Sequence, residues 1–357
     1  YNDIYSFFIH ISIKICYNYL GDKKMFNKIY DKIKEFIKFN LKGLIFLAVI
    51  IFLCFYKLPY VIYTPGGSIN LNERVKITDE ENINGGYYMN YVSVRKANVP
   101  LVLFSLFIPN WDIYNEEDVT DLDYNTSFKI EQIDLKNSIY YASLNAYKKA
   151  GKSINISSEK SFVTLVSEDS KTNLKVLDEI ISIDENKFTR LSEFQEYISS
   201  LNVGDKVTFV VKENGKEVEK YAYVITIEGE KKVGISIVTE YEFESDPNLE
   251  MKTKSSEAGS SGGLMLSLEI YDKLTKEDLS HGKKVMGTGT IDEDGNVGII
   301  GGIKYKMLGA EKDGADIFFV PKGNYEEAKK VYKKNNLTFD LVMVETFDEA
   351  INYLNNL

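Results

Sequence analysis

Hydrophobic and polar positions divide the 357-residue chain into segments of different character. Residues 43–63 are apolar except for Lys57. A membrane-spanning helix needs about 20 apolar residues, so this run predicts a transmembrane helix over residues 43–63. Lys57 lies near one end of the run, where its long side chain can reach the membrane surface.

Residues 64–128 alternate strand-like runs with polar loops, which predicts a β-rich region next to the membrane. The stretch 101–109 within this region is more apolar than a loop requires. Two interpretations are open: the stretch belongs to the core, or it is a patch that faces the membrane. Burial is favoured, because apolar runs in globular domains are normally buried.

The pattern over residues 129–233 predicts a small mixed domain. Its expected elements are a helix, a strand, a second apolar run, another helix and a hairpin, at 135–149, 162–166, 174–183, 191–199 and around Asn214-Gly215. Asn-Gly between two alternating runs is a strong hairpin signal. This order of elements resembles a bacterial PDZ domain. The resemblance implies that a peptide can add to the domain as an extra strand.

Charge is unevenly distributed along the chain. Residues 1–63 carry nine lysines and four acidic residues, whereas the whole chain has a net charge of −10. The lysines before residue 43 predict a cytoplasmic N-terminus and an extracytoplasmic location for everything after residue 63. Residues 58–63 are bulky and contain no small-residue cleavage site, which favours an uncleaved anchor over a signal peptide. The acidic remainder argues against nucleic-acid binding.

The first 24 residues are a special case. The chain begins with Tyr1, and Met25 is a plausible start. Residues 21–25 can be back-translated to a ribosome-binding site followed by a start codon, so we expect residues 1–24 to be translated upstream DNA. A second apolar segment is the alternative. The two cysteines, Cys16 and Cys54, do not support a disulfide scaffold or a cysteine-based metal site.

Candidate chemistry gathers near the C-terminal end. Residues 259–263 read Gly-Ser-Ser-Gly-Gly and precede an apolar helix-like run, and residues 301–306 read Gly-Gly-Ile-Lys-Tyr-Lys. An activated serine needs a base, and His281 is the one histidine after the first 24 residues. A lysine can act as this base if burial lowers its pKa from about 10.4 towards about 7–8. Apolar neighbours on a helix would bury Lys306 in this way.

The order and spacing of these motifs resemble the proteolytic domain of Lon-type serine proteases over residues 234–357. The resemblance implies that Ser261 is the nucleophile and Lys306 the base of a Ser/Lys dyad. It also implies that Thr288 contacts the lysine amine. Gly262, where the family usually has alanine, supports the site, because N–H groups at a helix N-terminus can hold an oxyanion.

Three other patterns are weaker. Residues 146–153 fit a permissive Walker A pattern, but they follow a helix and have bulky variable positions, so nucleotide binding is not expected. Residues 259–263 also match the nucleophile elbow of α/β-hydrolases, but no histidine follows His281 to complete that triad. The acidic stretch 292–296 is expected to be a hairpin turn and not a calcium loop.

We therefore expect an α+β protein with five parts. These are a cytoplasmic segment, a transmembrane helix, a β-rich membrane-proximal region, a PDZ-like domain and a Lon-type proteolytic domain, at 1–42, 43–63, 64–128, 129–233 and 234–357. The expected function is that of a single-pass membrane-anchored, ATP-independent serine endopeptidase that cleaves extracytoplasmic proteins without cofactor or metal. The alternative is a non-catalytic PDZ-type adaptor or chaperone at the membrane. Substrate, cleavage preference and homo-oligomerisation are left open.

Overall fold

A computed structural model describes residues 23–78, 86–119, 122–186, 191–213 and 215–357. The chain forms two compact units. One contains the residues up to Pro59 together with Lys96–Phe107, and the other contains Tyr60–Arg95 and Ile108–Leu357. Cys16 and nearly all of the proposed upstream segment lie outside the described residues.

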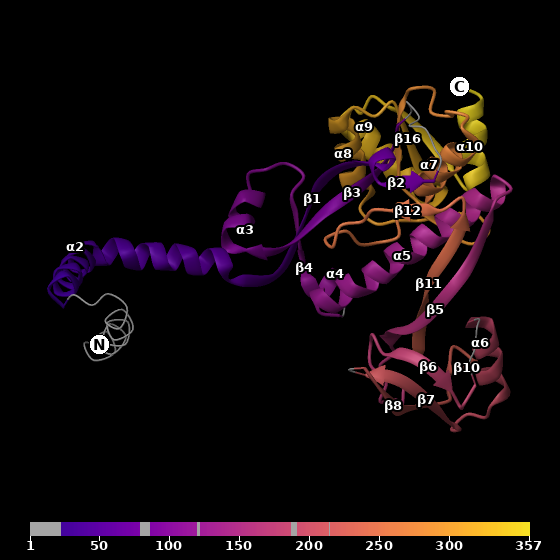
Figure 1. Cartoon of the computed structure of the whole chain (residues 1–357), viewed down its shortest axis with the longest axis horizontal. Coiled ribbons are helices and arrows are strands. Elements are labelled where there is room, and N and C mark those ends of the chain that lie inside the picture. Colours follow the sequence, from indigo (N-terminus) through magenta and orange to yellow (C-terminus); the bar gives the residue numbers. More distant parts are fainter. Residues whose placement is uncertain (1–22, 79–85, 120–121, 187–190, 214) are drawn as a thin grey trace. The chain divides into compact units, whose positions relative to one another are not determined.

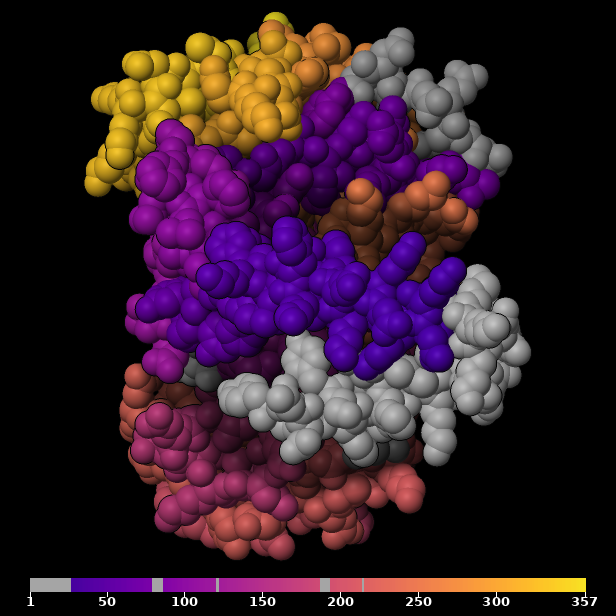
Figure 2. Space-filling view, turned by 90° about the vertical axis from the view of Figure 1, so that its left-hand side faces the viewer, coloured from indigo at the N-terminus to yellow at the C-terminus, as the bar shows by residue number. Residues whose placement is uncertain are grey.

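The first unit is built around helix α2 (Lys23–Phe55). Within α2, Asn27–Phe55 is long and apolar enough to cross a membrane, and its side chains are not buried in the protein. Figure 2 shows the exposed side chains of α2 in indigo. The predicted span, however, ran to residue 63. In the structure the helix ends at Phe55, and strand β1 (Lys57–Asn70) follows.

The end of the predicted span is wrong for a local reason. Pro59 lacks the backbone N–H that a helix interior needs, and the following Tyr-Val-Ile-Tyr is β-branched and aromatic, as is typical of strands. Val61 and Ile62 are buried in β1. A short apolar run alone does not distinguish a membrane helix from a buried strand.

A short helix, α3 (Val99–Ser105), packs against α2 (Figure 1). Asn98 caps α3 by accepting a hydrogen bond from the backbone N–H of Leu101, and its Nδ2 donates to the carbonyl of Cys54 at 2.6 Å. The expectation that residues 101–109 belong to the core is wrong, because most of the large apolar side chains after the first turn of α3 have no covering neighbour. The exposed ones are Leu103, Phe104, Leu106, Phe107 and Ile108.

The main sheet of the second unit has the strand order β17-β16-β13-β3-β1-β4. Besides β1, its strands are β3 (Gly86–Asn98), β4 (Asp112–Asn115), β13 (Lys284–Gly287), β16 (Ile317–Pro321) and β17 (Asp340–Val344). Strands β3, β13, β16 and β17 run parallel, and β4 pairs antiparallel with β1. The region 64–128 therefore supplies strands to the same sheet as the region after residue 234.

Helices cover both faces of this sheet. They are α5 (Tyr124–Lys149), α7 (Gly263–Thr275) and α10 (Phe347–Asn355) over one core, and α8 (Ile303–Asp313) and α9 (Tyr325–Asn335) over the other. Side chains alternate between the two faces along a strand. Val285 and Phe319 thus lie in the first core, whereas Met286 and Phe318 lie in the second. The near-continuous apolar strands follow from burial on both faces.

A second sheet has the strand order β11-β5-β6-β7-β8. Its strands are β5 (Ser153–Val166), β6 (Glu179–Ile183), β7 (Lys206–Glu213), β8 (Lys216–Tyr223) and β11 (Ile235–Asp246). Helix α6 (Leu191–Ser200) contributes Phe194 and Ile198 to the core of this sheet. The predicted helix at 191–199 is confirmed, and so is the hairpin, because Glu213 pairs with Lys216.

Strands β5 and β11 form a long antiparallel pair (Figure 1). The strand that begins just after residue 234, where we expected the proteolytic domain to start, therefore lies in the second sheet. Alternation of apolar and polar residues predicts a strand but does not show which sheet it joins.

The remaining described elements are short. In chain order they are η1 (Leu71–Glu73), β2 (Val75–Ile77), α4 (Glu116–Val119), β9 (Ile225–Ile227), β10 (Glu230–Lys232), β12 (Leu249–Met251), β14 (Thr290–Ile291), β15 (Val297–Gly298) and η2 (Lys322–Asn324). Strand β12 pairs antiparallel with β2. This pair fixes the chain just before the loop that leads to α7.

Candidate active site

The loop 252–262 connects β12 to α7 and carries the predicted nucleophile. Helix α5 holds this loop at two points. The N–H of Gly259 donates to the carbonyl of Glu131 at 2.7 Å, and Ser138 Oγ donates to the carbonyl of Ser260 at 2.9 Å. Gly259 has a φ of +93°, which favours glycine. The backbone is therefore fixed before it enters α7.

Small residues at the start of α7 allow neighbouring elements to approach closely. A Cβ atom on Gly262 would lie 2.7 Å from Met89 Sδ, and one on Gly263 would lie 2.8 Å from Ile291 Cγ2. Among the described residues, the N–H groups of Ser261 and Gly262 have no hydrogen-bond acceptor. Free N–H groups at a helix N-terminus can bind an oxyanion.

Lys306 comes from α8, which begins after Gly302. Gly302 has a φ of +71°, and a Cβ atom there would lie 2.7 Å from Val92 Cγ2. Helical spacing places Lys306 on the same face as Ile303 and Ala310, both of which are buried. The side chain of Lys306 therefore points into the protein, and the residue is only 3% exposed.

The three predicted catalytic side chains meet in the structure. Lys306 Nζ lies 2.5 Å from Ser261 Oγ and 2.9 Å from Thr288 Oγ1. Thr288 Oγ1 donates to the carbonyl of Ser261 at 3.0 Å. Since this bond uses the only hydroxyl proton of Thr288, its oxygen accepts from the lysine amine. The lone pair of a neutral amine is then left for the hydroxyl proton of Ser261.

Burial lowers the pKa of Lys306 to about 7, because desolvation penalises the ammonium form. Among the described residues, no carboxylate lies within salt-bridge distance of its Nζ to offset this cost. The amine is therefore neutral in a substantial fraction of molecules near neutral pH. This is the state in which lysine accepts a proton.

Two neighbours with the same chemistry point elsewhere. Lys304 Nζ forms an ion pair with Asp112 Oδ2 at 2.6 Å, and Tyr305 donates to the same carboxylate oxygen at 2.6 Å. Ser260 is held through its carbonyl by Ser138. The structure therefore brings Lys306 and Ser261 together, and not Lys304 or Ser260.

A cleft of about 550 Å³ opens beside Ser261. Its lining includes Met89 and Tyr91 of β3 together with Gly262 of the loop. Arg74 and Glu257 also line the cleft. Their ion pair, at 2.8 Å, connects the segment after β1 to the loop 252–262.

Sequence reasoning missed this contribution of residues 68–74 and 88–92 to the site. The run 87–94 predicts a strand, but no motif in it points to the serine. The partners Arg74 and Glu257 are 183 positions apart in the chain. A single sequence carries no signal for a contact at such a separation.

The weaker candidates lie away from the dyad. His281 Nε2 lies 3.2 Å from the carbonyl of Leu354 in α10. The stretch 292–296 is a turn between β14 and β15, as predicted. Residues 146–153 span the end of α5 and the start of β5, which is not the strand-to-helix order of a phosphate loop. Over the described residues, no cluster of three His, Cys, Asp or Glu side chains could hold a metal ion.

A serine at a helix N-terminus with a buried lysine amine beside it defines the class of Ser/Lys hydrolase sites. Comparison with known proteins agrees with this class. Residues 253–355 match the family model of the Lon protease (S16) C-terminal proteolytic domain, and residues 152–221 match that of the PDZ domain. The chain thus combines a PDZ domain with a Lon-type proteolytic domain in an α+β fold, and it also has an apolar N-terminal helix long enough to cross a membrane.

Individual relatives are similar to parts of the chain. A Lon protease of Mesomycoplasma hyopneumoniae is 29% identical over 96 residues, which cover 27% of this chain and 11% of that protein. A Lon protease of Roseiflexus castenholzii is 32% identical over 93 residues, covering 26% and 11%. The crystal structure of the PDZ domain of an SdrC-like protein from Listeria monocytogenes is 29% identical, with a TM-score of 0.21, and covers 24% of this chain and 93% of that one.

These similarities concern parts of proteins. The chain spans 11% of the length of both of these curated Lon proteases. The matched part contains Ser261, Thr288 and Lys306, and so supports a serine peptidase.

Proposed function

We propose that this protein is a membrane-anchored, ATP-independent serine endopeptidase that cleaves extracytoplasmic proteins. Ser261 is the nucleophile and Lys306 the general base of a dyad, with Thr288 orienting the amine. The observation that carries the proposal is the lysine: its Nζ is buried and lies 2.5 Å from Ser261 Oγ.

The geometry supports a two-stage acyl transfer. In the first stage the neutral amine of Lys306 takes the hydroxyl proton of Ser261 as its Oγ attacks the scissile carbonyl carbon. The lysine ammonium then gives this proton to the departing amide nitrogen, which leaves an acyl-enzyme. In the second stage Lys306 accepts a proton from a water molecule that attacks the ester, and returns it to Ser261 Oγ.

The negative charge on the carbonyl oxygen needs donors that are already in position. The N–H groups of Ser261 and Gly262 serve this purpose, because they are free at the start of α7. Thr288 and the N–H of Gly289 both donate to the carbonyl of Ser261, at 3.0 and 2.9 Å. These bonds keep the nucleophile's backbone from rotating as the charge develops.

The PDZ domain offers a second contact for a polypeptide substrate. Within the described sheet, β11 is an edge strand, paired on one side with β5. An extended peptide can add to such an edge through main-chain hydrogen bonds. In the sequence, β11 is followed by β12 and by the loop 252–262, which carries Ser261. A peptide bound along β11 would therefore be attached to the segment that leads into this loop.

Anchoring rests on α2, and orientation rests on the lysines that precede residue 43 in the sequence. Protease shaving of intact cells should remove residues beyond 63 and spare residues 23–42. Cleavage restricted to the lysine-rich segment would mean that the topology is the reverse of the proposed one. Independence of ATP would then have to be tested again.

Proteolysis itself is tested with the full chain and the variant Ser261→Ala. Casein hydrolysis and labelling by a fluorophosphonate probe should both be lost in this variant, and both should persist in Ser260→Ala, its matched control. A PDZ-type adaptor or chaperone without catalysis would show no hydrolysis in the unaltered protein either, and the proposal would fail.

A further inference from the structure

The uninterrupted apolar part of α2 is shorter than the hydrocarbon core of a bilayer, so the span that α2 offers includes charged residues. Uninterrupted apolar sequence runs from Gly43 to its end at Phe55, roughly 13 residues or about 20 Å at the rise of an α-helix. The hydrocarbon core of a bilayer is about 30 Å thick. Lys34, Lys38 and Lys42 precede this run and can extend it on the N-terminal side only by snorkelling. On the C-terminal side the chain turns into β1 at Lys57.

Additional apolar surface lies at this C-terminal end. Helix α3 belongs to the same compact unit and packs against α2. The bond from Asn98 Nδ2 to the carbonyl of Cys54, at 2.6 Å, ties the start of α3 to the last turn of α2. The two helices therefore hold a defined position relative to each other.

The outward side of α3 is unusually apolar. Phe107 is 83% exposed, Leu106 69%, Phe104 58% and Leu103 55%. At the end of α2, Phe55 is 77% exposed and Tyr56 52%. Residues 99–108 contain no charged side chain. A contiguous exposed patch of this kind marks a surface that is covered in the working protein.

We propose that the end of α3 and the turn that follows it, together residues 103–107, insert into the lipid bilayer beside α2. The occupant of this surface is lipid, because the patch continues the exposed apolar surface of a helix suited to a membrane and lies at the end of that helix's uninterrupted apolar run. Aromatic and leucine side chains with no charge match the boundary between headgroups and acyl chains. This inference rests on the anchoring part of the proposed function, but not on its catalytic part.

The test uses the full chain in phosphatidylcholine vesicles, with Trp111, the only tryptophan, replaced by phenylalanine. A new tryptophan is then introduced as Phe107→Trp or, in a second variant, Phe104→Trp. Leu47→Trp in α2 is the membrane control, and Met343→Trp, an exposed position on β17, is the aqueous control. Quenching by lipids with a spin label near the headgroup or deep in the acyl chain is measured for each.

We expect Phe107→Trp and Phe104→Trp to show blue-shifted emission and a loss of fluorescence with the shallow label that Met343→Trp does not show. Leu47→Trp should respond more strongly to the deep label. If Leu47→Trp is quenched but both α3 variants respond only to aqueous acrylamide, insertion is wrong while anchoring stands. Blue-shifted emission without lipid quenching, varying with the protein-to-lipid ratio, would assign the patch to a second copy and overturn the proposal. No quenching of Leu47→Trp would refute anchoring itself, whatever the result of the casein assay.

Discussion

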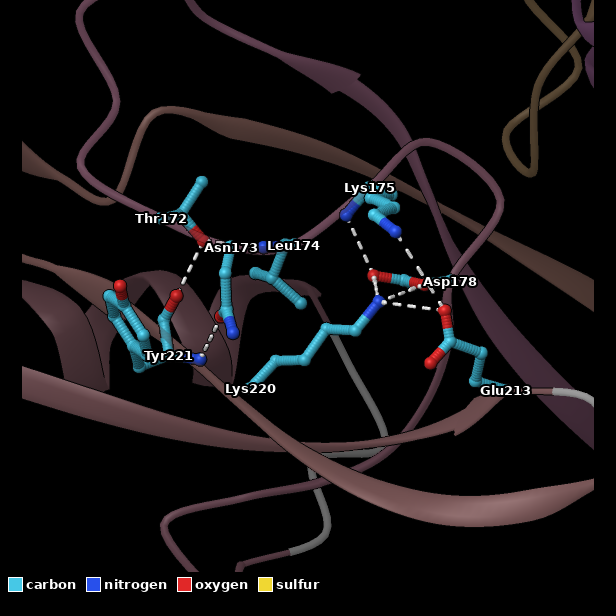
Figure 3. Close-up of polar contacts among 8 residues, drawn as sticks. All are labelled: Thr172, Asn173, Leu174, Lys175, Asp178, Glu213, Lys220 and Tyr221. Carbon is cyan, nitrogen blue, oxygen red and sulfur yellow. Dashed lines mark hydrogen bonds and ion pairs between the residues drawn. The ribbon is translucent and has the colours of Figure 1, made fainter.

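Two buried lysines of the protein, Lys220 in the PDZ domain and Lys306 in the proteolytic domain, have opposite surroundings. Lys220 in the PDZ domain is 6% exposed and has both carboxylate oxygens of Asp178 at 2.8 and 2.9 Å (Figure 3). Lys306 in the proteolytic domain is 3% exposed and has two hydroxyl groups instead. Burial is nearly equal, so the partner decides what each lysine can do.

A carboxylate balances the charge of a buried ammonium, and the pair then acts as a structural tie. Asp178 is itself held, because the N–H of Lys175 donates to its Oδ2 at 2.7 Å (Figure 3). Hydroxyl groups leave the charge unbalanced, and burial then lowers the pKa of Lys306 to about 7. The comparison separates a lysine that stabilises a fold from one that is suited to accept a proton.

The largest loss of activity should come from a substitution that keeps the positive charge at position 306 but cannot release its proton. Lys306→Arg should lower kcat/KM for casein or a peptide by about a thousandfold or more, because arginine stays protonated and cannot take the proton of Ser261. Lys304→Arg is the matched control and should retain most activity, since Lys304 faces Asp112. Equal losses in both variants would contradict the assignment of the base.

Breaking the pair in the PDZ domain should affect stability and not chemistry. Asp178→Asn removes the close counter-charge of the buried Lys220 ammonium and leaves only the partly exposed Glu213 at 3.7 Å, which should cost about 3 kcal/mol of unfolding free energy. Glu213→Gln is the control: this carboxylate is 3.7 Å from Lys220 but is partly exposed, so a change within about 1 kcal/mol is expected. Urea denaturation followed by hydrogen exchange in β7 and β8 measures both.

Hydrolysis of a short peptide by Asp178→Asn should remain near that of the unaltered protein at low temperature. A collapse of peptide hydrolysis with the PDZ domain still folded would mean that the two lysine sites are not independent.

Thr288 should give an intermediate loss. Thr288→Val keeps the shape but removes the acceptor for the amine and one donor to the carbonyl of Ser261, which should reduce kcat about 10–100-fold. Thr290→Val, two residues further on and outside the hydrogen bonds of the dyad, should change kcat little. An unchanged kcat in Thr288→Val would remove the orienting role.

The smallest effect is a gain of stability. The pKa of Lys306 is about 7 in the folded protein and about 10.5 when unfolded, so the unfolded state binds more protons between these values and stability rises with pH. Below pH 7 the full cost of burying the ammonium is present. Lys306→Met should therefore raise the unfolding free energy by about 1–3 kcal/mol at pH 7, with the gain disappearing towards pH 10. Thermal melts at several pH values, with Lys304→Met as the control, would show whether this gain in stability is present or absent.

The comparison of the two lysines also shows what a single sequence can predict. The Gly-Ser-Ser-Gly-Gly and Gly-Gly-Ile-Lys-Tyr-Lys motifs placed Ser261 and Lys306 at the starts of two helices, because local glycines and apolar spacing are written in consecutive residues. Asn214-Gly215 marked the PDZ hairpin for the same reason. These are local signals, and the elements that they predict are present.

The sequence carried no comparable signal for residues that are far apart in the chain but in contact in the structure. Nothing in the sequence paired Asp178 with Lys220, which is 42 positions further along the chain. The end of the membrane span was misjudged because residues 57–63 are as apolar as the helix before them. Exposure of Phe104 and Phe107 was likewise unpredictable, because an apolar run does not show whether a protein core or a membrane covers it.

The most direct test of the central claim is the pH dependence of peptide hydrolysis by the full chain. A neutral Lys306 as base predicts that kcat/KM rises through an apparent pKa of about 7 and then levels off. The matched control is His281→Ala, which should show the same curve because His281 Nε2 lies at the carbonyl of Leu354 and not at the dyad. A rate that is flat from acid to alkaline pH, or an inflection that His281→Ala abolishes, would contradict the dyad.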